Sequence, residues 1–269
     1  PSTINRRLRI VTNLYRWALK REMLERLPFS YSDVTSHGID HDLAHVTGGS
    51  QTVGKPDVLL DEWEKEPVFL AAEQLKAARA SIRSTSQRLL FDLMTRVGLR
   101  SVEACTFPLA YVFNPATRPH LKPGTLIEVR LDPRHMEIKL DKPRTVHVPY
   151  SLMEDMNAYA RFERNRHIVP EREPKALLLT VNGNAYVKGS AHKVMQDLGR
   201  KVGFSIRPLM LRHSYAIHTL LLLRASPDIK LEPLMYVRDR LGHRSVQTTM
   251  IYLNQIERLL GAEALSMLD

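Results

Sequence analysis

The 269-residue chain has a single cysteine, Cys105, which excludes an internal disulfide bond and a metal site built on paired cysteines. It has no apolar run of about 18 residues, the length that a membrane-spanning helix needs, and no leader in which charged residues precede apolar ones. Phosphate-binding loops of the Gly-x-x-x-x-Gly-Lys type and His-Glu-x-x-His pairs are also absent. We therefore expect no cofactor, no metal, no membrane partner and a cytoplasmic location.

Acidic residues are in deficit, because 29 Asp and Glu face 39 Lys and Arg, which leaves a net charge of +10. A basic balance favours polyanionic partners such as nucleic acid or an acidic membrane surface. Many basic proteins are merely soluble, so charge alone leaves nucleic-acid binding open. The 43% of hydrophobic residues is typical of a folded globular protein.

The first segment, residues 3–24, has the periodicity of an amphipathic basic helix. Its apolar positions recur at spacings of three and four, and they are Ile4, Leu8, Val11, Leu14, Trp17 and Ala18. Most of the remaining positions are basic: Arg6, Arg7, Arg9, Arg16, Lys20 and Arg21. Two interpretations stay open, a face that contacts DNA phosphates and a solvated face on a packing helix.

The rest of the chain is predicted to be mainly α with a small antiparallel three-stranded β-sheet, an α+β fold. Residues 28–67 read as an exposed connection that contains a domain boundary. Three short strands are expected over 125–131, 136–140 and 144–148, because β-branched residues alternate there between turn residues. Helical patterns cover 68–82, 87–97, 151–164, 192–202, 209–224, 234–241 and 251–267.

Three segments carry the candidate chemistry, in the order TRVGLRSVE (Thr95–Glu103), PLMLRHSYAIHTL (Pro208–Leu220) and LGHRSVQTTMIY (Leu241–Tyr252). Each has an ordinary alternative: a surface arginine after a turn, a structural arginine in a buried helix, and a core tyrosine. Together, with the small sheet between the first and the second, they resemble the catalytic part of the tyrosine recombinases of the phage integrase type. The resemblance covers most of the chain, from about residue 68 onward.

The resemblance implies specific catalytic residues. They are Arg100 and Arg212 as phosphate-binding arginines, His243, and Tyr252 as the nucleophile, with Glu103 as the acidic partner that orients Arg100. The hairpin segment IKLDKPRTVHVP resembles the stretch that carries the family's catalytic lysine. It favours Lys139 as general acid, with Lys142 as the fallback, because the register of a hairpin is poorly fixed by sequence. Two solvent-exposed lysines beside a turn are the alternative.

The implied reaction breaks and rejoins DNA through a 3′-phosphotyrosine, without metal or nucleotide. Two guanidinium groups suit it, because each stays charged, can bind two phosphate oxygens and stabilises the charge that the transition state adds. A tyrosine with a reference pKa near 10 attacks well at neutral pH only beside cations or a proton acceptor. The implied partners are duplex DNA and three further protomers, a homotetramer on paired DNA sites, in the bacterial cytoplasm or nucleoid.

The resemblance also implies a domain layout. Residues 1–30 would be the end of a truncated helical core DNA-binding domain, with DNA contacts from Arg6, Arg7, Arg16 and Lys20. Residues 31–67 would form a linker and residues 68–269 the catalytic domain. Because the chain begins inside a helical pattern, we expect it to be a fragment of a longer protein.

One position departs from the family pattern. The second box normally has histidine or lysine three residues before its arginine, and here that residue is Leu209. Leucine cannot donate a hydrogen bond to phosphate, so activity is expected to be reduced unless Arg207, His213 or His243 substitutes. Two alternatives therefore remain, a catalytically impaired DNA-binding relative and a type IB topoisomerase-like enzyme that relaxes supercoils. The LGH and MLRHSYA runs favour the recombinase over the topoisomerase.

Overall fold

The computed structural model describes residues 2–35, 52–61, 66–168, 174–226 and 231–266. The chain divides into two compact units, residues 1–66 and residues 67–269. The candidate chemistry lies entirely in the second unit. Each unit is described below by itself.

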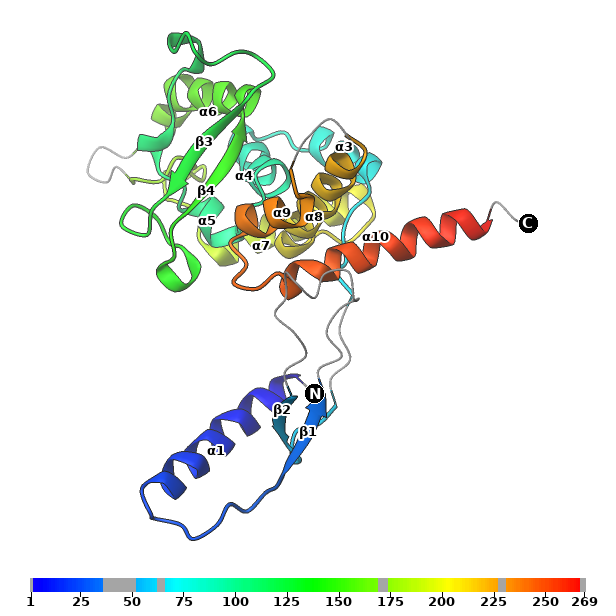
Figure 1. Ribbon diagram of the computed structural model, residues 1–269. Helices are drawn as coiled ribbons and strands as arrows, with labels where there is room; N and C mark the ends of the chain where they lie inside the picture. Colours follow the sequence, from blue (N-terminus) through cyan, green and yellow to red (C-terminus); the bar gives the residue numbers. More distant parts are fainter. Residues whose placement is uncertain (1, 36–51, 62–65, 169–173, 227–230, 267–269) are drawn as a thin grey trace. The chain divides into compact units, whose positions relative to one another are not determined.

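The first unit combines one long helix with a two-stranded sheet (Figure 1). Helix α1 (Ser2–Lys20) precedes strand β1 (Tyr31–Thr35), which pairs antiparallel with β2 (Thr52–Pro56). The expected exposed connection over 28–67 thus contains two strands that its sequence pattern did not predict. Each strand has only five residues, and its partner lies far along the chain, so the local pattern could not indicate the pairing.

Helix α1 does not bury the apolar stripe that its periodicity suggests. The buried residues are Asn5 and Thr12, and the Asn5 side chain bonds both the backbone N–H and the C=O of Leu60. Leu14 and Trp17, by contrast, are 61% and 50% exposed. Polar groups thus attach this helix to the rest of its unit.

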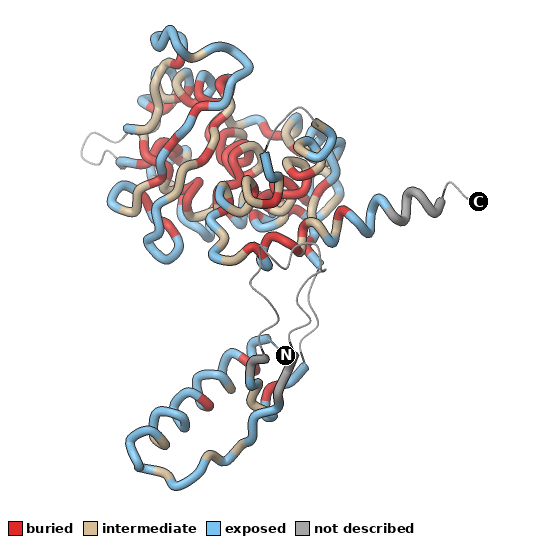
Figure 2. The backbone as a smooth tube through the Cα atoms, in the orientation of Figure 1, coloured by how far each residue is buried: buried red, intermediate tan, exposed pale blue. Residues whose placement is uncertain are grey.

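The second unit is mainly helical, as predicted, and its core surrounds α4 (Thr85–Arg96) and α8 (Pro208–Arg224) (Figure 2). Helix α8 is apolar on most of its faces, which is typical of a helix that is covered on several sides. Around this pair lie the other helices: α3 (Ala72–Ala80), α5 (Ser101–Cys105), α6 (Tyr150–Phe162), α7 (Lys188–Val202), α9 (Pro233–Leu241) and α10 (Gln247–Ser266).

The sheet of the second unit has two strands rather than three. Strand β3 (Leu126–Leu131) pairs antiparallel with β4 (Arg144–Pro149), so that Val129 lies opposite Val146. The predicted strand over 136–140 is wrong. Met136 and Ile138 are buried as an alternating pattern requires, but Lys139–Asp141 forms a 3-10 turn in which Leu140 has φ +65°. A left-handed residue ends extended pairing, so the segment becomes the tip of a long hairpin loop.

In the part of the chain that the structure describes, no helix has both the length and the apolar character needed to cross a membrane.

Candidate active site

The fold gathers the ends of several elements at one place in the second unit. Arg100 is the residue before α5 and follows a turn at Gly98, whose φ is +73°. Arg212 lies in the second turn of α8, and His243 follows Gly242, the residue that ends α9. Tyr252 lies in the second turn of α10. Residues from all three sequence boxes are thus neighbours in space.

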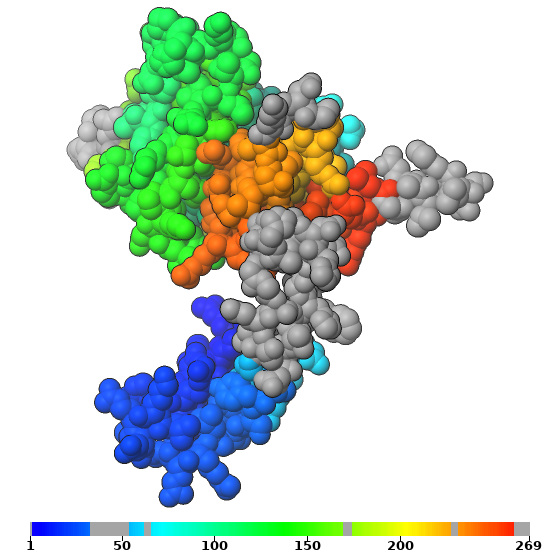
Figure 3. All heavy atoms as spheres, in the orientation of Figure 1, coloured from blue at the N-terminus to red at the C-terminus, as the bar shows by residue number. Residues whose placement is uncertain are grey.

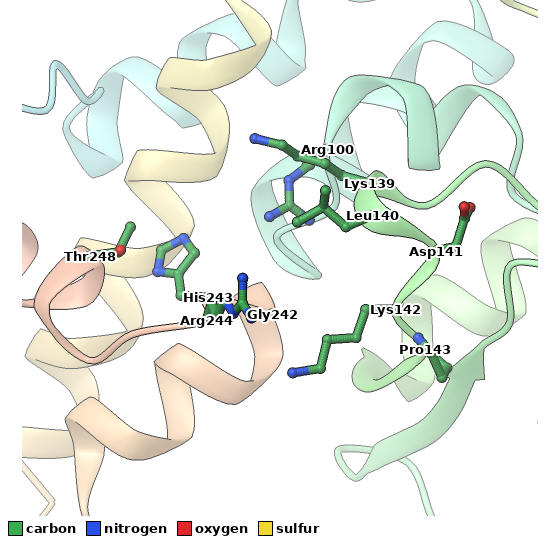
Figure 4. Close-up of a pocket in the computed structure, with 10 residues that line it drawn as sticks. All are labelled: Arg100, Lys139, Leu140, Asp141, Lys142, Pro143, Gly242, His243, Arg244 and Thr248. Carbon is green, nitrogen blue, oxygen red and sulfur yellow. The ribbon is translucent and has the colours of Figure 1, made fainter. Parts of the chain in front are cut away.

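The residue before α5, the hairpin loop, the segment after α9 and the start of α10 line an open pocket of about 690 Å³ (Figure 4). Five of its lining side chains are basic or imidazole groups, and Asp141 is its one carboxylate. In Figure 4, Lys142 extends from the hairpin loop toward Arg244 and Lys139 extends past Arg100, whereas Asp141 points away. A pocket of this charge suits an anion such as a phosphate group. Its lining comprises Arg100, Lys139, Leu140, Asp141, Lys142, Pro143, Gly242, His243, Arg244 and Thr248.

Glu103 lies at the centre of the basic groups and is fully buried. It accepts two hydrogen bonds from Arg144, at 2.8 and 2.6 Å, and one from the Arg100 guanidinium at 3.0 Å. It also accepts the backbone N–H of Arg100 at 2.8 Å. Burial alone would raise the pKa of Glu103, but the bonds and charges of Arg144, with Arg212 and the Arg100 backbone, lower it to about 2. Glu103 is therefore an anion that fixes the orientation of Arg100.

Arg144 links the hairpin to α5, through Glu103, and to the end of α9. Besides its bonds to Glu103, its Nε donates to the backbone C=O of Arg240 at 2.9 Å, close to the end of α9. A Cβ atom at Gly242 would lie 2.7 Å from Cδ of Arg144, so only glycine fits there at φ +63°. The close approach of Arg144 to Gly242 fixes the backbone conformation that leads to His243. Arg144 lies in the hairpin segment IKLDKPRTVHVP, but the sequence prediction assigned a role there only to Lys139 and Lys142, because the partners of Arg144 are distant along the chain.

Arg212 is buried and joins the first box to the third. Its guanidinium donates to the C=O of Gly98 at 2.5 Å and to the C=O of Leu241. Burial and the nearby Arg100 lower the pKa of Arg212 to about 9, while Glu103 opposes that shift. The group therefore stays cationic at neutral pH. Because both partners are backbone carbonyl oxygens, Arg212 holds the segments at Gly98 and Leu241 in place independently of the side chains there.

His243 stacks on Tyr252, with ring centroids 6.1 Å apart and planes inclined by 18°. Its Nδ1 lies 2.9 Å from Oγ1 of Thr249, a fully buried residue that belongs to the Thr-Thr pair before Tyr252. Burial and the charge of Arg212 lower the pKa of His243 to about 3. The imidazole is thus neutral at neutral pH. Thr249, which no prediction named, orients it.

Tyr252 is only 2% exposed and is not among the described residues that line the pocket. Its hydroxyl lies 2.9 Å from Nδ1 of His213. Burial raises the pKa of Tyr252, and the charges of Arg212 and Arg100 partly offset that shift. The hydroxyl therefore lies within the field of both arginines.

The remaining predicted residues lie outside this cluster. Leu209 is in the first turn of α8 and is 61% exposed. The four predicted DNA-binding residues, Arg6, Arg7, Arg16 and Lys20, are all exposed on α1 in the first unit. Within the described residues, no group of three or more His, Cys, Asp or Glu side chains is arranged to hold a metal ion.

Comparison with known protein families gives this arrangement its context. The model of the phage integrase family matches residues 69–258, which is well over half of the chain. The chain therefore belongs to the phage integrase family, the family of the tyrosine recombinases.

The hairpin, α9 and the start of α10 lie on one face of the second unit, where Figure 3 shows the green and orange segments side by side.

Two curated relatives match about 70% of the chain. The tyrosine recombinase XerD of Lacticaseibacillus casei is 26% identical over 200 residues, 69% of this chain and 58% of the relative. Transposase A from transposon Tn554 of Staphylococcus aureus is 27% identical over 191 residues, 70% of this chain and 48% of the relative. The chain thus spans about half the length of the curated relatives it matches.

Solved structures share the fold. The XerH site-specific recombinase in a post-cleavage complex with its difH substrate gives a TM-score of 0.55 at 24% identity, covering 74% of this chain and 53% of XerH. The Tn1549 transposon integrase in complex with a circular intermediate DNA gives a TM-score of 0.60 at 13% identity, covering 94% and 74%. At these identities the likeness concerns the fold alone.

Proposed function

We propose that this chain is the catalytic portion of a site-specific DNA recombinase that integrates or excises a mobile element through a 3′-phosphotyrosine intermediate at Tyr252. The observation that carries the proposal is the cationic pocket, in which Arg100, Lys139 and His243 meet beside the buried tyrosine. The charge and size of the pocket suit a DNA phosphate. The curated relatives, a tyrosine recombinase and a transposase, support the same reaction class.

Each side chain has a role that follows from its chemistry. Arg100, oriented by Glu103, and Arg212 hold the nonbridging oxygens of the scissile phosphate and stabilise the charge that the transition state adds. His243, a neutral imidazole, donates a hydrogen bond to the same phosphate. Lys139 protonates the departing 5′ oxygen, and Lys142 is the fallback for that step, since both reach the pocket from the hairpin loop.

Tyr252 attacks the phosphorus, and the 5′ oxygen leaves, so that a phosphotyrosine and a free 5′-hydroxyl form. A second DNA 5′-hydroxyl then reverses the step and reseals the strand. Because Tyr252 is 2% exposed, DNA binding must open the side of the pocket next to Tyr252 before the hydroxyl can reach a phosphate. The free protein is thus protected from cleaving DNA that is not properly bound.

The proposed partners are duplex DNA and three further copies of the protein. The first unit, with α1 as the end of a core DNA-binding domain over residues 1–30, contributes Arg6, Arg7, Arg16 and Lys20 to phosphate contacts. Residues 31–67, most of which share the first unit with α1 and which include β1 and β2, lead on to the catalytic domain, 68–269. The C-terminal turns of α10 project away from the other helices of their unit, with Leu259 and Leu260 exposed, which suits packing on a neighbouring protomer (Figure 1).

The test uses a library of nicked duplexes with randomised sequence, incubated with the protein without metal or nucleotide. We expect a denaturant-resistant adduct whose DNA shares a sequence and whose attached peptide, identified by mass spectrometry, contains Tyr252. The variant Tyr252→Phe should form none, and the matched control Tyr150→Phe, which alters another buried tyrosine, should form as much as the wild type. An adduct at a different residue, or none at any sequence, contradicts the proposal.

A second candidate function is a DNA-binding relative that has lost most of its cleavage activity. Leu209 favours it, because a leucine that is 61% exposed stands where the family supplies a hydrogen-bond donor. In this case the protein selects a specific sequence from the same library by noncovalent binding and forms no adduct.

A further inference from the structure

His213 is placed by the fold against the hydroxyl of Tyr252. It follows Arg212 in α8, and its Nδ1 lies 2.9 Å from the Tyr252 oxygen, within the reach required of a general base. The two rings are inclined by 56°, with centroids 5.4 Å apart, so this contact is tilted rather than stacked. His213 is therefore in direct contact with the atom that would attack DNA.

The other candidates for this contact are less well placed. His243 lies parallel to the Tyr252 ring, and its Nδ1 is engaged with Thr249. Leu209 has no group that can take up a proton. Arg212 stays charged and donates to two backbone carbonyls. Among the described groups around Tyr252, His213 is the one with a ring nitrogen within hydrogen-bonding distance of the tyrosine hydroxyl.

We propose that His213 is the proton acceptor for Tyr252 in DNA cleavage, a catalytic role that compensates for leucine at position 209. The inference rests on the proposed function of Tyr252 as nucleophile. The O–H bond of Tyr252 breaks, its proton moves to Nδ1 of His213, and the oxygen keeps the electron pair with which it bonds to phosphorus. The bond from phosphorus to the 5′ oxygen breaks, and that oxygen takes a proton from Lys139. Resealing reverses each transfer.

The charges around His213 prevent this proton transfer until DNA is bound. Burial and Arg212 lower the pKa of His213 to about 4, so the imidazole is neutral and free to accept. The titratable and charged groups next to His213 are Arg212 in the same helix, Tyr252 in α10 and His243 in the loop between α9 and α10. A bound phosphate adds negative charge beside these groups and so stabilises the imidazolium that forms. Without DNA, the proton stays on Tyr252.

The first test is the pH dependence of single-turnover cleavage with the duplex selected from the library. Wild type should cleave at a nearly constant rate from about pH 5.5 to 8, where His213 is already deprotonated. His213→Gln keeps a hydrogen-bonding side chain but cannot take up a proton. The cleavage rate of this variant should be roughly 100-fold lower near pH 7. It should rise about tenfold per pH unit, because a larger fraction of Tyr252 then loses its proton to solvent before the attack. The matched control His218→Gln, in the same helix, should follow wild type.

A second arm replaces Tyr252 with a difluorotyrosine, whose phenol ionises near neutral pH. This nucleophile needs no base, so the defect of His213→Gln should nearly vanish. A purely structural role predicts an equal loss with either nucleophile and at every pH, and a restraining hydrogen bond predicts faster cleavage by the variant. Either result overturns the proposal.

A third arm needs no DNA and so separates this proposal from the proposed function. Nitrogen NMR of the protein labelled in its histidines reports which ring nitrogen of His213 carries hydrogen. We expect a bare Nδ1 and a protonated Nε2 in wild type, because Nδ1 accepts from Tyr252. If Nδ1 carries the hydrogen, His213 is a donor to Tyr252 and the proposal fails, whether or not an adduct forms. A bare Nδ1 without any adduct would instead contradict the assignment of Tyr252 as nucleophile.

Discussion

Arg144 and Glu103 form a doubly hydrogen-bonded ion pair in which the carboxylate is fully buried and the arginine side chain is 7% exposed. The pair joins the hairpin to the segment that carries Arg100. A buried charge that loses its partner costs about 3–5 kcal/mol, because it can neither reach water nor be neutralised by a neighbour. The geometry of the pocket therefore depends on a residue outside the predicted catalytic set.

Replacing Arg144 with glutamine should lower the free energy of unfolding by about 3 kcal/mol. Urea denaturation followed by circular dichroism measures this change. The matched control is Arg130→Gln on the paired strand β3, where the arginine is exposed and the change should stay within about 0.5 kcal/mol. Equal stabilities of the two variants would contradict the structural role assigned to Arg144.

The stability of the protein should fall with acid in a way that depends on Glu103. Its pKa is about 2 in the folded protein and 4.5 by default, so the ionised carboxylate stabilises the fold above pH 4.5. As pH falls from 4.5 toward 2, protonation removes about 3 kcal/mol of that stability. In Glu103→Gln, the unfolding free energy measured by urea at each pH should be lower at neutral pH and should lack this part of the decline. A variant that declines as steeply as wild type would refute the assignment.

Gly242→Ala should impair both folding and cleavage. Its φ of +63° costs an alanine about 1–2 kcal/mol, and the new Cβ would meet Arg144. The melting temperature should fall, and adduct formation should fall with it, because His243 is the next residue. Gly189→Ala is a control of opposite sign, since Gly189 lies in the first turn of α7 with open space around it, and an alanine at a compatible backbone position should stabilise the protein by roughly 0.4–1 kcal/mol. Unchanged melting of Gly242→Ala would be the contrary result.

Much of the fold was accessible from the sequence where the signal is local. The periodicity of α4 and the uniformly apolar α8 predict helices, and the mainly helical class is confirmed. The third strand over 136–140 was wrongly predicted, because Met136 and Ile138 alternate correctly while the left-handed turn at Leu140 is a tertiary effect. Strands β1 and β2 were missed for a similar reason, since only distant pairing forms them.

The candidate site shows the same division. Arg100, Arg212, His243 and Tyr252 stand inside contiguous motifs, so the sequence could indicate them, although their catalytic roles stay a prediction. Arg144 and Thr249 also stand in quoted segments, but their roles became visible only through contacts: that of Arg144 with Glu103 across the fold and that of Thr249 with His243, six residues earlier. The burial of Tyr252 against His213 likewise depends on how α8 and α10 pack. Sequence motifs thus indicate which side chains a site uses, and packing decides which atoms meet.

The basic face of α1 should contribute to DNA affinity through phosphate contacts. Changing Arg6, Arg7, Arg16 and Lys20 together to glutamine should lower the slope of log affinity against log salt by about 0.9 per lost contact. Fluorescence anisotropy with a short nonspecific duplex over a range of salt concentrations measures this slope. The control changes four exposed basic residues outside the pocket to glutamine: Lys76, Arg83, Lys122 and Lys193. If both sets reduce the slope equally, α1 has no special part in DNA binding.

Leu209→His should raise the cleavage rate with little effect on stability. The leucine is 61% exposed in the first turn of α8, so its replacement disturbs no core packing and should change the unfolding free energy by less than about 0.5 kcal/mol. A histidine there supplies a donor three residues before Arg212. One added hydrogen bond to a charged phosphate is worth about 1.5–3 kcal/mol in the transition state, so cleavage should become roughly 10- to 100-fold faster.

Single-turnover cleavage of the selected duplex measures the gain. Leu209→Gln is the matched control, because its amide also donates a hydrogen bond but does not titrate. A gain shared by both variants would indicate that position 209 lacks only a donor to the phosphate. A gain limited to histidine would indicate that proton transfer limits the wild-type rate. If neither variant is faster, leucine at this position costs nothing, and the prediction of reduced activity is wrong.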